Sequence, residues 1–333
     1  GPCSRGGHRK PSPRSVCVCL VLPLLCECEL RRTQSYPTRT LGPPPGRGCG
    51  ASKDAWEIKH ESGTTAIVYA HGATVTSVKT AAGKELLFVS EKAKFDGASP
   101  IRGGIPVVFP IFGAGWGGIE GLPSHGFARR SRWALKQEGD EVFLTLSSDD
   151  LSAEVRAVFP HPFDLKYGIE LSKDGFATAL TVRNTGDAPI SFQALLHTYY
   201  AVEDIKGVKI GGLDGFQYID KLDAAAADKT GAAELNFAAE TDSIYKSVKG
   251  DIVVSGVVGG NGDSQISIEI KCSADSKDCV VWNPWIAKAA KMSDFGDDEW
   301  PRMLCVEPGF VAQPFELAAG KEFAIRQMVT ARL

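Results

Sequence analysis

From about residue 55 to the C-terminus, the chain is a succession of short β-strand patterns separated by turn residues. Residues 176–183 and 265–270 alternate apolar and polar side chains, as a half-buried strand requires. No stretch longer than one or two turns has the periodicity of an amphipathic helix. Further strands are predicted for residues 56–60, 64–70, 74–80, 85–90, 132–137, 141–147, 151–159 and 165–172. Many short strands joined by turns predict a large antiparallel β-sandwich with few short helices.

Two local sequences refine this expectation. Gly139-Asp140 is an acceptable turn for a hairpin between two of the predicted strands. Residues 222–228 are rich in alanine and predict one short helix, although their helical periodicity is poor. Residues 51–333 show no linker, no clear repeat and no transmembrane segment, so we predict that they form one sandwich domain.

The first fifty residues have a different composition from the rest. They hold eight Lys or Arg against two Glu, and they are rich in Pro, Ser and Cys. The apolar run at residues 16–25 is too short to cross a bilayer, and the segment resembles a signal or organellar transit sequence. Cys17/Cys19 and Cys26/Cys28 are a weak metal signal, because no histidine accompanies them. We predict that residues 1–50 are disordered or targeting-like.

Charge and cysteine content limit the function of residues 51–333. The formal charge is -3 for the whole chain and about -9 for this part, which argues against a nucleic-acid partner. Three cysteines, Cys272, Cys279 and Cys305, fit a reducing compartment without structural disulfides. Six histidines with no close pair argue against a catalytic zinc site. We expect a cytoplasmic protein, or a plastid or other organellar one if residues 1–50 are a transit segment.

Residues 101–133 form a long loop pattern in which charges stand among glycines and prolines. Arg102 precedes two glycines, and His125 and Arg129 follow a glycine-rich span. Two arginines and a histidine on such a scaffold can meet one small anion, whereas the alternative is a surface loop with solvated arginines. The span from Gly113 to Gly118 looks like a dinucleotide loop, but no helix follows it and no βαβ unit surrounds it.

Four other positions are candidates for chemistry, each with an alternative structural role. His197 shares one face of a predicted strand with polar neighbours, although a buried core histidine is more common. Glu307 is predicted to end an apolar strand before a turn, where it acts in proton transfer or caps the turn. Trp282 is either a platform for a sugar ring or a core residue. Asp242 stands at the start of a predicted strand, where a turn role is expected.

Taken together, these motifs resemble the glucose-6-phosphate 1-epimerases, or hexose-6-phosphate mutarotases, of the aldose 1-epimerase (galactose mutarotase-like) superfamily. The resemblance runs from about Trp56 to the C-terminus and leaves out residues 1–50. The motifs occur in the order and at the spacing of the family. They are Arg102-Gly-Gly-Ile-Pro106 with Phe109-Pro110, Leu122-Pro-Ser-His-Gly-Phe-Ala-Arg129, His197-Thr-Tyr199, Glu240-Thr-Asp242-Ser-Ile-Tyr245 and Val306-Glu307-Pro-Gly309.

The resemblance implies a role for each matching residue. His197 matches the catalytic histidine of the family, and Glu307 matches its catalytic glutamate. Ser124 stands where some members bind substrate through a glutamine, so its shorter reach puts that contact in doubt. His125 stands where galactose mutarotases keep a histidine that faces the sugar ring. The implied substrate-binding residues are therefore Arg102, Ser124, His125, Arg129 and Asp242.

The resemblance also implies a reaction, the interconversion of the α and β anomers of a hexose 6-phosphate. Such a reaction needs acid–base groups but no cofactor and no metal, and its only implied partner is the sugar phosphate. We expect a monomer that binds neither nucleic acid nor membrane. One alternative is a mutarotase of free aldoses, for which Arg102 and Arg129 have no anion to bind. The other is an inactive sugar-phosphate-binding protein, which needs neither His197 nor Glu307 as a proton-transfer pair.

Overall fold

The computed structural model describes residues 38–41, 54–114, 119–139, 141–223, 227–257 and 266–332. All of them belong to one compact unit, Ser35–Leu333. The predictions for residues 1–37 and 42–53, and for the glycine-rich residues 115–118, lie outside this description. Within the described ranges, no helix is long and apolar enough to span a membrane.

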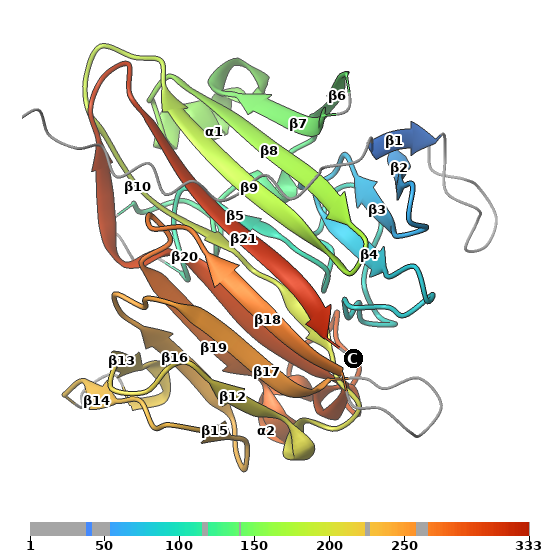
Figure 1. Ribbon diagram of the computed structural model, residues 1–333. Helices are drawn as coiled ribbons and strands as arrows, with labels where there is room; N and C mark the ends of the chain where they lie inside the picture. Colours follow the sequence, from blue (N-terminus) through green and yellow to red (C-terminus); the bar gives the residue numbers. More distant parts are fainter. Residues whose placement is uncertain are drawn as a thin grey trace, which may run out of the picture. The chain divides into compact units, whose positions relative to one another are not determined.

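Three antiparallel sheets make up the unit (Figure 1). The four-stranded sheet has the order β1 (Thr38–Leu41), β2 (Ala55–His60), β3 (Thr65–Tyr69), β4 (Val75–Lys79). The eight-stranded sheet has the order β14 (Lys229–Thr230), β13 (Gln217–Asp220), β16 (Thr241–Tyr245), β19 (Asp278–Asn283), β20 (Met303–Leu317), β10 (Ile190–Leu196), β5 (Val107–Val108), and β11 (Tyr199–Ala201) also pairs with β20. The nine-stranded sheet has the order β15 (Leu235–Asn236), β12 (Lys209–Gly211), β17 (Asp251–Val257), β18 (Ile266–Cys272), β21 (Glu322–Arg332), β9 (Gly175–Asn184), β8 (Phe163–Ser172), β7 (Glu141–Ser147), β6 (Ala134–Glu138).

Helices are few and short in the described part of the chain. The α-helices are α1 (Ala153–Val158) and α2 (Trp285–Ala289), and the 3₁₀ turns are Ala128–Arg130, Ser148–Asp150, Ile205–Gly207, Lys221–Asp223 and Trp300–Arg302. The predicted antiparallel β-sandwich with few short helices is therefore confirmed. The predicted helix at residues 222–228 begins as the 3₁₀ turn Lys221–Asp223, and residues 224–226 lie outside the described ranges.

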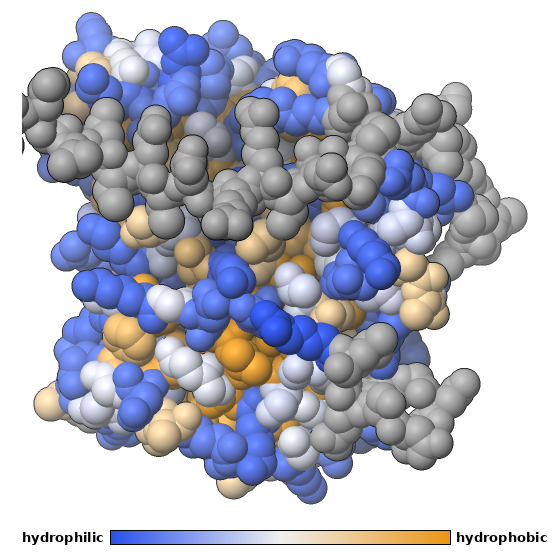
Figure 2. All heavy atoms as spheres, viewed as in Figure 1, coloured by the Kyte–Doolittle hydropathy of each residue, from blue (hydrophilic) through white to orange (hydrophobic). Residues whose placement is uncertain are grey.

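The period-two alternation of the strands gives the two large sheets a common core. Along β8, Phe163, Leu165 and Tyr167 are buried, while the residues between them are more exposed. Burying such a side chain contributes about 1.5–3 kcal/mol. Gln327 of β21 hydrogen-bonds across the core, because its Nε2 donates to Thr198 Oγ1 at 2.8 Å. Figure 2 shows mostly hydrophilic residues on the face viewed in Figure 1, with apolar ones in the recesses between them.

Two strand predictions are wrong, each for a local reason. Residues 151–159 contain α1, because Ser152 caps the first turn by accepting a hydrogen bond from the Val155 N–H, and Ala and Glu favour helix. Residues 85–90 form only isolated bridges to different partners. There the Glu85 carboxylate accepts hydrogen bonds from the Ser77 hydroxyl at 2.5 Å and from the Leu87 N–H at 3.1 Å. In a continuous strand, the Leu87 N–H would donate to a backbone carbonyl instead.

A truncation tests where the folded domain begins. Residues 1–50 contain no strand pattern in the sequence, yet Thr38–Leu41 forms β1 and pairs with β2. Deletion of residues 1–34 is therefore expected to leave the melting temperature unchanged within about 2 °C. Deletion of residues 1–50 also removes an edge strand, and each kcal/mol lost lowers Tm by about 2–4 °C. Calorimetry of both truncations checks this, and an equal loss in both would place the boundary before residue 35.

Candidate active site

The predicted anion-binding loop lies against the segment between β10 and β11 that carries His197. Within the loop, β5 pairs with the end of β10. The backbone N–H of His197 then donates to the Pro106 carbonyl at 3.0 Å, and that of Tyr199 donates to the Gly104 carbonyl at 2.9 Å. These main-chain contacts bring Arg102 and His197 to one place, although they are far apart in the sequence.

Two glycines of the loop are required by close backbone packing. Gly104 has φ +67°, and a Cβ there would lie 2.1 Å from the Val75 carbonyl oxygen. Gly126 has φ +72°, and a Cβ there would lie 2.1 Å from the Phe109 carbonyl oxygen. His125, directly before Gly126, also has a positive φ of +62°, a conformation that few non-glycine residues adopt. The glycines seen in the sequence thus fix the direction in which Arg102 and His125 leave the loop.

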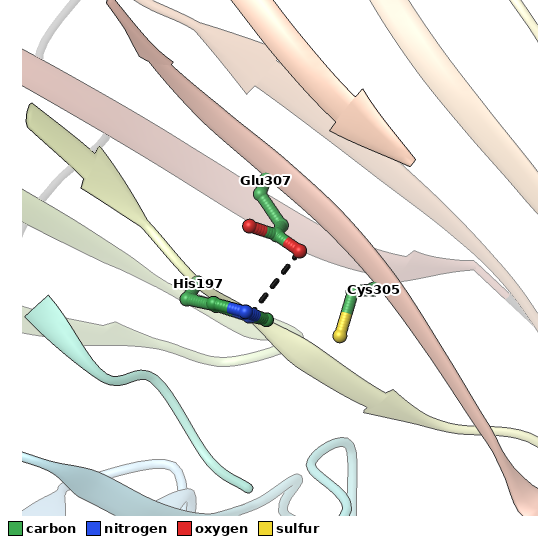
Figure 3. Close-up of side chains that lie close together, drawn as sticks. All are labelled: His197, Cys305 and Glu307. Atoms are coloured by element: carbon green, nitrogen blue, oxygen red, sulfur yellow. Dashed lines mark ion pairs between the residues drawn. The ribbon is translucent and has the colours of Figure 1, made fainter. Parts of the chain in front are cut away.

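Glu307 lies opposite His197 on β20, and the two side chains point toward each other (Figure 3). Glu307 Oε1 is 3.2 Å from His197 Nδ1, and both side chains are buried. The two atoms are not aligned as a hydrogen bond, and neither has another such partner among the described residues. The predicted turn after Glu307 is wrong, because β20 continues through Pro308 and Gly309 in register with β19 and β10. Glu307 is therefore an interior strand residue rather than a turn cap.

The environment moves the pKa values of this pair in opposite directions. Burial, followed by the charge of Asp242, raises the pKa of Glu307 well above its ordinary value. Burial, followed by the charges of Arg129 and Arg102, lowers the pKa of His197 well below its ordinary value. Both groups therefore favour their neutral forms, which is the behaviour of a buried pair that exchanges one proton.

Aromatic rings hold the His197 imidazole in place. The Tyr199 ring stacks on it with a centroid distance of 4.8 Å and an interplanar angle of 9°, so the predicted shared face is confirmed. The Trp282 ring meets the imidazole edge-on at 6.0 Å. Trp282 is buried and also contacts Tyr199, so it forms a wall of the site. Trp285, the second tryptophan of the sequence Trp282-Asn283-Pro284-Trp285, packs instead on Trp300, with ring centroids 4.3 Å apart.

Arg102 is fixed by two partners at the edge of the site. Its Nε and Nη2 donate to the Asp294 carboxylate at 3.2 and 3.1 Å, and its Nη1 donates to the Tyr199 hydroxyl at 3.1 Å. Burial disfavours the charge of Arg102, but the nearby Tyr199 and Asp294 outweigh it and raise the pKa of Arg102. The guanidinium of Arg102 is therefore charged, and Asp294 and Tyr199 fix its orientation.

Arg129 is a second cation of the site, and it is buried. Its Nη2 donates to the backbone carbonyl of Ser124 at 2.7 Å. Its Nε is buried and has no hydrogen-bond partner within the described ranges. Burial, and then the charge of Arg102, lower the pKa of Arg129 to about 10. A buried guanidinium with a free N–H is an expected feature of an anion site.

The remaining predicted residues lie around this centre. His125 Nδ1 accepts a hydrogen bond from the Gly113 N–H at 3.3 Å, and its ring is 5.5 Å from that of His197. Asp242 is buried near the start of β16, so its predicted place at a strand entry is confirmed, but the expected turn role is wrong because Asp242 pairs with Trp282 of β19. It accepts a hydrogen bond from Lys221 Nζ at 3.1 Å. Ser124 is exposed, and its carbonyl supports Arg129. The structure thus brings together His125, Arg129, His197, Asp242 and Glu307, with Arg102 beside them.

Several residues of the site carry no recognisable signal in the sequence. Lys221 lies with its Nζ 4.8 Å from the centre of the Phe112 ring, and its charge acts on His125, His197 and Glu307. Asp294 comes from a loop after α2, where nothing in the local pattern marks it. Among the neighbours of His197, Tyr199 was detectable from the sequence, because it stands two positions later in what the pattern predicted to be one strand.

The structure also assembles a set of metal-type ligands that histidine spacing does not reveal. The ligand atoms of His197, Cys305 and Glu307 lie within 4.8 Å of one another, and all three residues are buried. Nitrogen, sulfur and oxygen donors of this kind suit zinc. The nearby charges of Arg102 and Arg129, however, disfavour a divalent cation there. The arrangement is better suited to proton transfer.

Comparisons with known proteins show the family to which the chain belongs. The aldose 1-epimerase family profile matches residues 54–330. A Cenchrus ciliaris protein, provisionally named glucose-6-phosphate 1-epimerase, is 33% identical over 280 residues, 79% of this chain and 80% of that protein. A Salmonella typhimurium structure, provisionally described as a mutarotase, aligns with a TM-score of 0.71 at 28% identity, covering 83% of this chain and 90% of that one. A galactose mutarotase related enzyme from Lactobacillus acidophilus shares the fold, with a TM-score of 0.65 at 16% identity over 84% of this chain and 97% of that one.

Proposed function

Since the chain belongs to the aldose 1-epimerase family, we propose that it interconverts the α and β anomers of a hexose 6-phosphate, with glucose 6-phosphate as the expected substrate. One observation carries this proposal. A buried carboxyl and imidazole lie 3.2 Å apart beside Arg129, whose buried Nε has no hydrogen-bond partner among the described residues. The first two groups suit proton transfer, and the third suits an anion.

The acid–base pair supplies what anomerisation requires. Glu307, as carboxylate, takes the proton of the anomeric hydroxyl, and His197, as imidazolium, protonates the ring oxygen. The C1–O5 bond breaks as the carbonyl forms, C1 turns about the C1–C2 bond, and ring closure reverses both proton transfers. Positioned groups of this kind contribute about 10²–10⁴-fold each to the rate. Electrons and protons balance over the cycle within the substrate and this pair.

The arginines explain a phosphorylated substrate. Arg129 offers its unpartnered Nε, and Arg102 is held at the same site by Asp294 and Tyr199. Guanidinium groups bind phosphate oxygens through charge-assisted hydrogen bonds, whereas a neutral sugar leaves the buried Nε of Arg129 without an anionic partner. Asp242, which is buried and bonded to Lys221, is suited to accept hydrogen bonds from sugar hydroxyl groups.

Anomer exchange measured by NMR tests the proposal directly. Exchange between the two anomers of glucose 6-phosphate is expected to rise in proportion to added protein, and that of free glucose far less. Equal acceleration of both sugars would instead identify a mutarotase of free aldoses. Resonance shifts of the sugar phosphate without any added exchange would identify a binding protein.

A further inference from the structure

We propose that an inorganic dianion held by Arg102 and Arg129 activates proton transfer at His197, so that sulfate speeds anomer exchange of an unphosphorylated sugar. The inference rests on the proposed function and concerns the same site. It assigns the 6-phosphate a second task besides binding, because the charge of the phosphate prepares the catalytic pair for ring opening.

A direct path connects the arginine with the imidazole. Arg102 Nη1 donates to the Tyr199 hydroxyl at 3.1 Å, and the Tyr199 ring lies flat against the His197 ring at 4.8 Å. Tyr199 and His197 are both buried, so little water lies between the Arg102 guanidinium and the His197 imidazole. In such surroundings, one charge acts on another more strongly than it does in water.

Arg129 supplies the second cation and the free donor. Its side chain is buried, and its Nε has no partner within the part of the chain that the structure describes. A buried charged donor without a partner costs free energy that an anionic ligand recovers. Arg102 and Arg129 act on each other as like charges, and a dianion between them also removes that repulsion.

These cations keep a proton away from His197. After burial, Arg129 and Arg102 are the largest influences that lower its pKa, followed by Lys221. At Glu307, the largest influence after burial is the carboxylate Asp242, which raises the pKa. The proton shared by the pair is therefore held on Glu307. Ring opening needs the opposite arrangement, with a carboxylate base and an imidazolium acid.

A dianion shifts the shared proton toward His197, because it binds at the two arginines that act on this imidazole. By balancing Arg102 and Arg129, it raises the pKa of His197, and the proton passes from Glu307 Oε1 to His197 Nδ1 across 3.2 Å. Other titratable groups around the pair are His125, Tyr199, Lys221, Asp242 and Cys305. Arg129 and Arg102 are the two largest charges acting on His197, whereas at Glu307 Arg129 follows Asp242 and Lys221, so the anion raises the pKa of His197 more than that of Glu307.

Sulfate is a suitable probe, because it stays a dianion through the neutral pH range and is too weak a base to catalyse mutarotation itself. Anomer exchange of free glucose is measured with the full chain, with sulfate or with sodium chloride of equal ionic strength. We expect sulfate to raise the enzyme-dependent rate about tenfold or more, which corresponds to a rise of one in the pKa of His197. The acid limb of the rate profile should move to higher pH, because His197 then loses its proton at higher pH, whereas the alkaline limb, at which Glu307 loses the remaining proton, should move less.

Two variants connect the effect with the arginine pair. Arg129→Ala is expected to lose the response to sulfate, whereas Arg130→Ala, an exposed neighbour, is expected to keep it. A response that survives in Arg129→Ala overturns the inference. It is also overturned if sulfate competes with glucose 6-phosphate in the wild-type chain but leaves glucose exchange unchanged, or if sulfate does not compete at all. In both of these cases, turnover of glucose 6-phosphate shows that the proposed function still stands.

Discussion

Glu307→Gln is expected to lower kcat for anomer exchange by about 10²–10⁴-fold with little change in substrate affinity. The substitution keeps the size of the side chain but removes the carboxylate that accepts the anomeric proton. His197→Asn should cause a loss of the same order, because it removes the group that protonates the ring oxygen. Line-shape or exchange NMR gives kcat, and titration of the sugar phosphate gives the affinity.

The double variant is the sharper test of this pair. Because Glu307 and His197 act together in each proton-transfer cycle, the double variant should be scarcely worse than either single one. If the loss of kcat in the double variant equals the product of the losses in the two single variants, the two side chains act independently. A Glu307→Gln protein that folds and turns over at a near wild-type rate would remove the glutamate from the mechanism, and Asp242 would be the next carboxylate to test.

The pH dependence follows from the directions of the two pKa shifts. Activity requires that the pair hold one proton, so it should rise as the doubly protonated pair loses its first proton and fall as the pair loses its last one. Because burial raises the pKa of Glu307 and lowers that of His197, the remaining proton is held on Glu307, and the acid and alkaline limbs lie on either side of that form. The limbs report apparent values of the coupled pair rather than of either residue.

Arg129→Ala and Arg102→Ala are expected to remove the preference for a phosphorylated sugar. Each loses a charge-assisted contact of about 1.5–3 kcal/mol, so kcat/KM for glucose 6-phosphate should fall about 10- to 150-fold. The value for free glucose should not fall with it, since that sugar has no anion to bind and loss of either cation raises the pKa of His197. Arg130→Ala, with its exposed side chain, is the matched control and should keep the wild-type ratio.

Comparison of kcat/KM for the two sugars in each variant measures this preference. A variant that keeps the full preference for the phosphorylated sugar shows that its arginine is not a phosphate ligand. Thermal unfolding of the same preparations separates this outcome from instability, because Arg129 is buried and its carbonyl contact to Ser124 is lost in the alanine variant.

Sequence alone determined the strands and the family. The alternation along β8 and β9 is local, and burial of one face of a sheet is sufficient to select it, so these strands were predictable. The motifs around Arg102, Arg129, His197, Asp242 and Glu307 identified the aldose 1-epimerase family, which the family profile confirms. Local signals were less reliable where capping competed with strand propensity, as at Ser152.

Only the tertiary structure decided how the site works. Glu307 was expected at a turn, but pairing of β20 with β10, β11 and β19 keeps it inside a sheet and opposite His197. Asp294 and Lys221 joined the site without any local pattern, because their partners Arg102 and Asp242 lie far away in the sequence. The charge state of a buried pair depends on every neighbouring charge and on the exclusion of water, and both are properties of the folded chain.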